Sequence, residues 1–231
     1  MAGAPAGSSW SPDARGDTTM TAAVVRPDPA VGRVVAPRPR GLYRPLKRLA
    51  DVAGSFALLV IGSPVMLAVA IAIRLDSPGP ALFRQRRIGR GSREFVIFKF
   101  RTMREGTPDL ASHLMQGQAA SRITRIGAFL RRTSLDELPQ LFNILKGDMS
   151  FVGPRPALHN QYDLIGMRQV AEVDALKPGV TGWAQINGRD DVPMEAKVAL
   201  DRWYLERCGP GTDLAILVRT PFALMSGRGV N

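Results

Sequence analysis

A run of 22 uncharged residues constrains this chain more than any other feature. It extends from Val52 to Ile73 and reads VAGSFALLVIGSPVMLAVAIAI. A helix rises 1.5 Å per residue, so this run is long enough to cross a ~30 Å hydrocarbon core. It begins too far from the N-terminus for a signal peptide, and the acids and prolines before it fit that class poorly. The run predicts a membrane-embedded segment; a buried helix of a soluble protein is the alternative.

The charges around this run bear on how it meets the membrane. Six Lys and Arg residues lie within twenty positions before it and six within twenty after it. The positive-inside rule therefore gives no orientation for a spanning helix, and equal flanks are expected if both stay in the cytoplasm. Of the formal net charge of +11, residues 1–105 carry +10. Because this charge surrounds a lipid-length apolar run and no nucleic-acid-binding module is recognisable, we expect anionic membrane lipids, and not nucleic acid, as partners.

Ser63 and Pro64 divide the run into two arms of twelve and ten residues. Pro64 has no N–H for the carbonyl of Val60, so the helix should kink there, and the Ser63 hydroxyl can satisfy a freed carbonyl. Each arm is then ~15–18 Å long, about half a bilayer. We predict a re-entrant helix-break-helix that dips into one leaflet and returns. A kinked spanning helix is the alternative, because prolines are tolerated in transmembrane helices.

Outside the run, the chain is predicted to be α+β and mainly helical. Residues 1–41 are rich in Ala, Gly, Pro and Arg and predict a disordered basic arm, whose arginines either lean on anionic lipid or are simply solvated. We expect residues 42–76 to form the re-entrant membrane segment and residues 77–231 to form a folded domain. We expect a short β-hairpin from residues 81–86 and 94–100, joined by GRGS at 89–92. Apolar residues at helical spacing follow, and residues 213–225 predict an interfacial helix too short to span.

Asp136 and Glu137 are adjacent carboxylates that follow two arginines, in the sequence RRTSLDELP. Ser134-x-x-Glu137 fits a capping box, in which the acids would only stabilise a helix start. The functional alternative gives the two carboxylates different tasks, because successive helical residues point ~100° apart. One could then attack a substrate while the other holds a metal.

Two loops could hold an anionic ligand. Arg155 lies between Pro154 and Pro156, whose fixed φ angles make the loop stiff and present a guanidinium suited to a diphosphate; a plain surface turn is the alternative. KPGVTGWAQINGR at 177–189 is punctuated by glycines that allow either close approach to a ligand or simple turns. No Walker A or dinucleotide-binding fingerprint occurs in the sequence.

In this order the motifs resemble the bacterial sugar transferases, the small monotopic phosphoglycosyl transferases. The matching segments cover residues 46 to about 220 and include KRLADVAGSFALLVIGSPVMLAVAIAIRLDSPGPALFRQRRIG, FKFRTM, RRTSLDELPQLFNILKGDMSFVGPRP, KPGVTGWAQINGR and LDRWYLER. The stretch CGPGTD at 208–213 departs from the aromatic-rich segment common in the family, which puts the local helix boundary in question. The family's extra N-terminal membrane helices are also missing from this sequence, so the chain is expected to be the minimal catalytic form.

The resemblance implies transfer of a phosphosugar from a nucleotide diphosphosugar, expected to be a UDP-sugar, to polyprenol (undecaprenyl) phosphate. The products are polyprenyl diphosphosugar and UMP, in the first membrane step of surface glycan or exopolysaccharide assembly. Asp136 matches the family's nucleophile, which forms an aspartyl-phosphosugar intermediate in a ping-pong mechanism. Glu137 matches the partner that helps to bind Mg²⁺. The implied location is the cytoplasmic face of the bacterial inner membrane, where residues 77–231 are expected to form the catalytic domain.

Further site residues follow from the same resemblance. Arg155 matches a nucleotide-contacting arginine and Arg131 one that handles the lipid phosphate. Additional candidates for the substrate site are Lys99, Arg101 and Arg189. Asp201 is a candidate metal ligand, with an exposed helical acid as its alternative reading. A catalytically silent membrane adaptor with a relic site is the alternative function, and no motif fixes the sugar or the oligomeric state.

Overall fold

The fold is that of a computed structural model, which describes residues 41–107, 121–188 and 192–225. The expectation for residues 1–41 therefore lies outside the described residues, apart from Gly41. The described helices and strands all belong to one unit that extends from Arg33 to Asn231.

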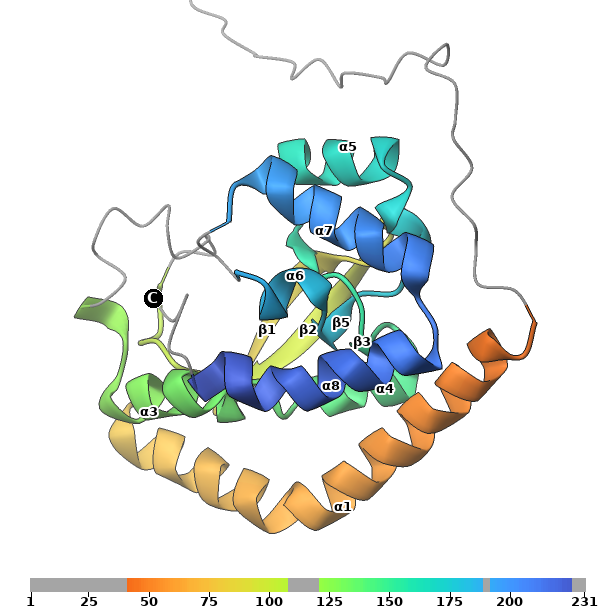
Figure 1. The fold of residues 1–231 in the computed structure, drawn as a ribbon. Helices are drawn as coiled ribbons and strands as arrows, with labels where there is room; N and C mark the ends of the chain where they lie inside the picture. The colour runs from red at the N-terminus through yellow and green to blue at the C-terminus, as the bar shows by residue number, and fades with distance from the viewer. Residues whose placement is uncertain (1–40, 108–120, 189–191, 226–231) are drawn as a thin grey trace, which may run out of the picture. The chain divides into compact units, whose positions relative to one another are not determined.

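Helix α1, Tyr43–Asp76, contains the long apolar run and bends in its middle (Figure 1). Pro64 lies inside the helix, and the Ser63 hydroxyl donates a 2.8 Å hydrogen bond to the carbonyl of Val60. The predicted kink and the hydrogen bond from Ser63 are thus confirmed, but the two arms form one continuous helix that bends and is not interrupted. Of its most apolar stretch, 11% is buried within the described part of the chain, whereas the core helix of a soluble protein is mostly buried.

Two small sheets form the centre of the domain. β1 (Leu82–Ile88) and β2 (Glu94–Phe100) form the predicted antiparallel hairpin, joined by the 3-10 turn η1 (Arg90–Ser92). β4 (Ala157–Leu158) adds to the other edge of β1, giving the order β2-β1-β4. β3 (Ser150–Val152) pairs in parallel with β5 (Gly179–Thr181). These strands bring the loops that follow β2 and β3 to one region.

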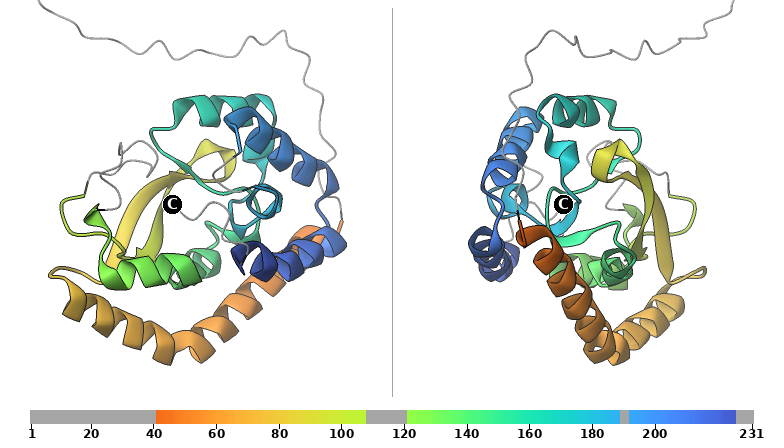
Figure 2. Two further views of the ribbon diagram at one scale, coloured as in Figure 1. Left: turned by 60° about the vertical axis from the view of Figure 1, so that its left-hand side comes forward. Right: turned by 90° about the vertical axis from the view of Figure 1, so that its right-hand side faces the viewer.

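Helices lie in two layers on either side of the strands. Towards α1 lie α3 (Arg125–Thr133), α4 (Gln140–Lys146) and α8 (Pro210–Met225); on the opposite side lie α5 (Tyr162–Val170) and α7 (Met194–Arg207), with the short α6 (Trp183–Ile186) between (Figures 1 and 2). Two 3-10 turns, η3 (Leu135–Glu137) and η4 (Val173–Ala175), complete the described helices. Both ends of α1 meet the domain, and its bend points away from it. The predicted α+β, mainly helical class is confirmed.

The two arms of α1 are anchored differently. The second arm buries Val69 and Ile73 against Phe100 of β2 and Leu130 of α3 in an apolar cluster. The first arm is held by polar contacts: Asp51, which is 5% exposed, accepts hydrogen bonds from the Ser150 hydroxyl and the Phe151 amide. Buried polar groups need such partners, so these contacts fix the arm to β3.

A third polar contact joins α1 to α8. Asp213 accepts hydrogen bonds from Tyr43, Lys47 and Tyr204 at 2.6–2.8 Å. Asp213 belongs to the segment that departs from the family pattern. Cys208 and Gly209 of this segment connect α7, which ends at Arg207, to α8, and Asp213 lies in the first turn of α8. Burial, with the negative charge of Asp213, raises the pKa of both tyrosines well above their usual range, so both hydroxyls keep the protons that they donate.

Candidate active site

The adjacent carboxylates Asp136 and Glu137 lie in the 3-10 turn η3, between α3 and α4. Ser134 has a left-handed conformation with φ of 57°, ends α3, and makes no side-chain capping hydrogen bond. The capping-box interpretation is therefore wrong, because the chain reverses at Ser134 where a capping box requires extended backbone. The tight turn instead presents both carboxylates to a cleft.

Glu137 is paired with two cations from distant parts of the chain. Its Oε1 lies 2.7 Å from Lys99 Nζ on β2 and 3.4 Å from an Arg155 guanidinium nitrogen. Burial opposes the charge on this carboxylate, but Lys99 and Arg155 outweigh burial and lower the pKa of Glu137 to about 2. Glu137 is therefore a fixed negative charge at neutral pH.

Asp136 has a different environment. No hydrogen bond or ion pair joins its carboxylate to another residue of the described segments. Burial, together with the negative charge of Glu137, raises the pKa of Asp136 to about 6, although nearby cations oppose the rise. Neighbouring carboxylates with pKa values pushed apart are the usual sign of distinct acid–base or nucleophilic roles.

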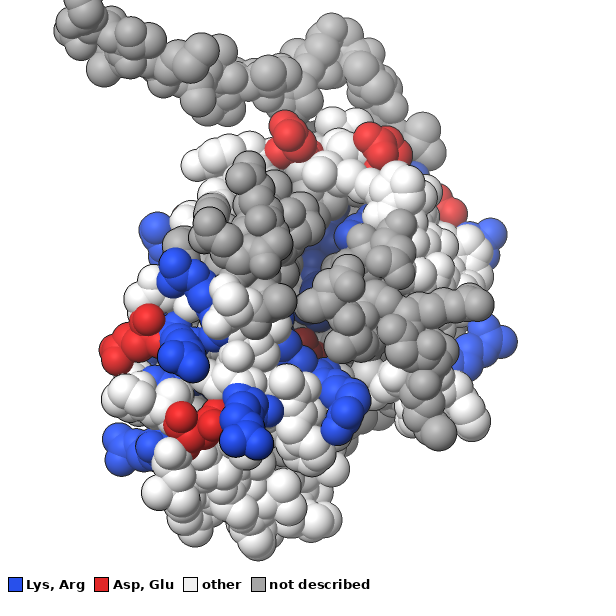
Figure 3. Space-filling view, turned by 90° about the vertical axis from the view of Figure 1, so that its left-hand side faces the viewer, with Lys and Arg blue, Asp and Glu red and all other residues white. Residues whose placement is uncertain are grey.

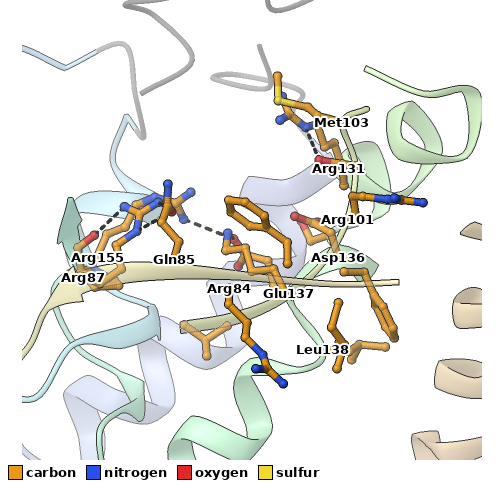
Figure 4. Close-up of a pocket in the computed structure, with 18 of the residues that line it drawn as sticks. Arg84, Gln85, Arg87, Arg101, Met103, Arg131, Asp136, Glu137, Leu138 and Arg155 are labelled. Carbon is orange, nitrogen blue, oxygen red and sulfur yellow. Dashed lines mark hydrogen bonds and ion pairs between the residues drawn. The ribbon is translucent and has the colours of Figure 1, made fainter. Parts of the chain in front are cut away.

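Arg131 and Arg101 also line the cleft but are used differently. Arg131, in the last turn of α3, donates through Nε to the Thr102 hydroxyl at 3.0 Å, and burial lowers the pKa of its guanidinium. Arg101 donates to the carbonyls of Pro78 at 2.5 Å and Ser77 at 2.7 Å, just beyond the end of α1. Arg101 therefore ties the end of α1 to β2. Arg131 lies beside Met103 in Figure 4, and the negative charge of Asp136 acts on its guanidinium.

The Pro154–Arg155–Pro156 loop is held through its backbone. The three carbonyls accept hydrogen bonds from the Gly179 amide (2.9 Å), Arg168 (2.8 Å) and Arg87 (3.0 Å), respectively. Prolines lack an N–H, so this loop depends on its carbonyls for attachment. In Figure 4 Glu137 lies between Arg155 and Arg87 on one side and Asp136, Arg101 and Arg131 on the other.

The glycine-rich segment packs against that loop through its residues 177 to 182. A Cβ on Gly182 would lie 2.1 Å from the carbonyl oxygen of Gly153, and one on Gly179 would lie 2.1 Å from the Gly153 amide nitrogen. Close approach of two backbones therefore explains these glycines. Trp183 and Gln185 follow on α6, while Arg189 lies outside the described residues.

An open cleft of about 2170 Å³ connects these groups to α1. Its lining includes Asp136, Glu137 and Arg155 and also apolar residues of α1 near its bend, such as Leu58 and Ile61. Figure 3 shows Lys and Arg side chains inside and around the hollow on this face. The cleft thus combines Lys and Arg side chains, the two carboxylates and apolar residues. This combination suits a ligand with an anionic head and a hydrocarbon tail.

Asp201 lies apart from the carboxylate pair. It is 1% exposed, and its Oδ2 accepts from two nitrogens of Arg168, at 2.7 and 3.2 Å. It is not among the residues that line the cleft. Within the described segments, no three His, Cys, Asp or Glu residues come close enough to form a metal cluster.

Sequence reasoning did not find Arg87 or Arg168. Both line the cleft and both hold the Arg155 loop. Arg87 lies in the matching segment FRQRRIG, where nothing singles it out from its neighbouring arginines, and Arg168 lies in a helix that contains no motif. Arg168 resembles any polar helical residue in the sequence YDLIGMRQV, so no local signal distinguishes it. Only its contacts across 13 and 33 positions identify it.

Comparisons with known proteins agree with this site. A family model described as bacterial sugar transferase matches residues 42–227. The UDP-glucose:undecaprenyl-phosphate glucose-1-phosphate transferase of Xanthomonas campestris pv. campestris is 46% identical over 164 residues, which are 68% of this chain and 34% of that protein. A transferase of the same name from Caulobacter vibrioides is 42% identical over 200 residues, covering 82% of this chain and 73% of that protein. The uncharacterized sugar transferase EpsL of Bacillus subtilis is 40% identical over 185 residues, covering 80% of this chain and 90% of that protein. The chain thus spans about a third of the Xanthomonas relative and most of the other two.

Proposed function

Since the chain belongs to the bacterial sugar transferase family, we propose that it transfers a phosphosugar from a nucleotide diphosphosugar to polyprenol phosphate. The names of two relatives specify UDP-glucose and undecaprenyl phosphate, which supports a UDP-sugar donor and that acceptor. The observation that carries the proposal is the asymmetry of the carboxylate pair. Glu137 is ion-paired, while Asp136 faces the same cationic cleft with no hydrogen bond from the described segments.

The proposed chemistry has two steps. An oxygen of Asp136 attacks the β-phosphorus of the donor, and the bond to the bridging oxygen breaks, so that nucleoside monophosphate leaves with that oxygen. The phosphosugar is then joined to Asp136 as an acyl phosphate, a mixed anhydride. An oxygen of polyprenol phosphate attacks the same phosphorus, displaces the Asp136 carboxylate and yields polyprenyl diphosphosugar. A covalent carboxylate intermediate of this kind gives ping-pong kinetics.

The cleft's own cations support this chemistry. Two anions must meet when a carboxylate approaches a diphosphate, and Lys99, Arg131 and Arg155 supply positive charge there. Arg155 offers a fork suited to a phosphate, and Arg131 is our candidate for the acceptor phosphate.

We further propose Mg²⁺ as the cofactor. Mg²⁺ is usually held by one or two carboxylates together with substrate phosphates, so it needs no cluster of three protein ligands. Asp136 and Glu137 fit this donor set, because both are carboxylates on the cleft and the paired oxygen of Glu137 leaves its other oxygen for a metal. When bound, the ion would neutralise phosphate charge.

The proposed topology is re-entrant, with the site at the cytoplasmic face of the cytoplasmic membrane. Both arms of α1 contact the same domain, and the bend is the part farthest from it (Figure 1). Large apolar side chains are exposed on α1 and also on the layer of α3, α4 and α8, where they include Phe129, Phe142 and Phe222. An exposed apolar layer with a bent apolar helix beneath it is what insertion into one leaflet requires.

Two experiments test these proposals. Purified protein with a β-phosphate-labelled UDP-sugar should release UMP and retain label, and Asp136→Asn should abolish both; full activity of that variant would show that Asp136 is not the nucleophile. For topology, single cysteines at positions 45 and 80 in a Cys208→Ser background should react from the same side of the membrane. Reaction from opposite sides would contradict the re-entrant arrangement and favour a kinked spanning helix.

A further inference from the structure

The loop that carries Arg155 depends on outside donors for its position. Two of its three residues are prolines and cannot donate a backbone hydrogen bond. The Arg155 side chain is 46% exposed, and its contact with Glu137 is long, at 3.4 Å. The position of the loop backbone therefore bears directly on where this guanidinium points.

Arg168 is the donor to the central carbonyl of this loop. Its NH1 lies 2.8 Å from the carbonyl oxygen of Arg155. The same guanidinium points its other edge at Asp201 of α7, with NH2 at 2.7 Å and Nε at 3.2 Å from Oδ2. One planar group thus links a carboxylate of α7 to the backbone of the loop.

The pair of Arg168 and Asp201 is buried, with side-chain exposures of 11% and 2%. A buried pair is a costly way to gain stability, because both charges lose their hydration. Its geometry is better explained as a means of fixing the orientation of the Arg168 guanidinium. Because Asp201 holds one edge of this planar group, the nitrogen on the other edge has little freedom to move.

We propose that Arg168, fixed by Asp201, is a positioning residue that holds the Arg155 backbone so that its guanidinium faces the donor diphosphate. This inference rests on the proposed function. It gives Asp201 an indirect role in place of metal binding, consistent with its absence from the cleft wall. Because a misplacement of about 1 Å can cost ~100-fold in rate, loss of this support should be visible in kinetics.

A double-mutant cycle tests the inference. We expect Arg168→Gln to lower kcat/KM for UMP release about 10- to 100-fold, and Arg155→Ala to lower it at least as much. Arg168 acts through Arg155, so adding Arg168→Gln to Arg155→Ala should change kcat/KM by less than about twofold. Losses that multiply, or an Arg168→Gln variant with wild-type kinetics, would overturn the inference.

Two further variants separate positioning from folding. Arg168→Lys keeps a charge for Asp201 but cannot span both partners, so we expect a folded protein with a reduced kcat/KM. Arg202 is the matched control, because it also donates to a carbonyl, that of Ala171 at 3.0 Å, and pairs with Glu206 on α7. Arg202→Gln should retain wild-type kinetics; an equal loss in that variant would indicate a general effect on α7 and overturn the inference.

Binding of UDP to the same proteins, measured by calorimetry, separates this inference from the proposed function. Positioning is supported if Arg168→Gln binds UDP more weakly than the wild type does, while the double variant Arg155→Ala/Arg168→Gln binds it as well as Arg155→Ala alone. This result would support positioning even if the wild type releases no UMP. In that case the proposed function fails alone. A wild type that neither turns over nor binds UDP overturns both.

Discussion

Lys99 Nζ and Glu137 Oε1 lie 2.7 Å apart and join β2 to η3 across 38 positions of sequence. This ion pair settles which of the two adjacent carboxylates is held as a fixed anion. Asp136 is left beside a permanent negative charge, partly buried and facing the cleft, which keeps its pKa above the usual range. The two residues therefore differ in chemistry although they are neighbours in the chain.

The activity should depend on the ionisation of Asp136. Since only the carboxylate can attack, and its pKa is raised to about 6, kcat/KM for UMP release should rise with pH and level off above about 7. At pH 5 it should be about a tenth of the plateau. The measurement is single-turnover UMP release without acceptor, because the donor diphosphate diester carries no group that titrates in this range. A profile that is flat between pH 5 and 7 would contradict the assignment.

Lys99→Met should move that midpoint. Lys99 is the strongest of the charges that lower the pKa of Asp136, so its removal should shift the midpoint above 6, in addition to slowing the reaction. The shift is read from the same pH series and is independent of the absolute rate. A midpoint that is unchanged or lower would show that Lys99 does not act on Asp136.

Asp136→Asn should stabilise the protein while it inactivates it. When a carboxyl group has a higher pKa in the folded than in the unfolded protein, the free energy of unfolding falls as pH rises from about 4 to 6. Above pH 6 the whole of this destabilisation remains. The neutral amide avoids this cost, so we expect a gain of about 1–3 kcal/mol at pH 7.5 and a smaller gain at pH 4.5. Thermal unfolding in one detergent at both pH values measures the difference. A variant less stable than wild type at pH 7.5 would contradict the burial argument.

Local rules predicted the shape of α1 well. The kink and the Ser63 hydrogen bond to the Val60 carbonyl follow from proline's missing N–H, which acts within four residues. The hairpin likewise follows from strand-like runs and a turn between them. These features depend on neighbours in sequence, which is why the sequence was sufficient.

The contacts between side chains of the site could not be predicted in this way. The capping box at Ser134 fits by spacing but fails because the turn between α3 and α4 requires a left-handed residue there. Asp201 could be suspected as a site carboxylate, yet its partner Arg168 lies 33 positions away. Such pairings depend on how α5 packs on α7, which no local pattern encodes.

Asp51 should be essential for docking the first arm of α1. It accepts hydrogen bonds from the Ser150 hydroxyl (3.1 Å) and the Phe151 amide (3.2 Å), so Asp51→Ala leaves a buried hydroxyl and a partly buried amide without this acceptor. We expect a loss of about 2–4 kcal/mol, and a smaller loss in Asp51→Asn, which keeps an acceptor oxygen. Thermal unfolding in detergent measures both. Asp163→Ala, at an exposed position of α5, is the control and should stay within about 0.5 kcal/mol of wild type; similar losses in all three variants would refute a specific role of Asp51.

Gly182→Ala should damage the site through backbone contact. Its Cβ would meet the Gly153 carbonyl oxygen at 2.1 Å, a distance that no side-chain rearrangement can relieve. The two backbones must separate, which should cost about 1–3 kcal/mol and displace the loop that starts at Gly153 and carries Arg155. Thermal unfolding and kcat/KM for UMP release should therefore fall together. Gly166→Ala is the matched control, because nothing lies within 4 Å of its Cβ and its position inside α5 favours alanine, so that variant should be active and more stable by up to about 1 kcal/mol. Equal behaviour of the two alanine variants would mean that the contact between Gly182 and Gly153 does not set the position of the Arg155 loop.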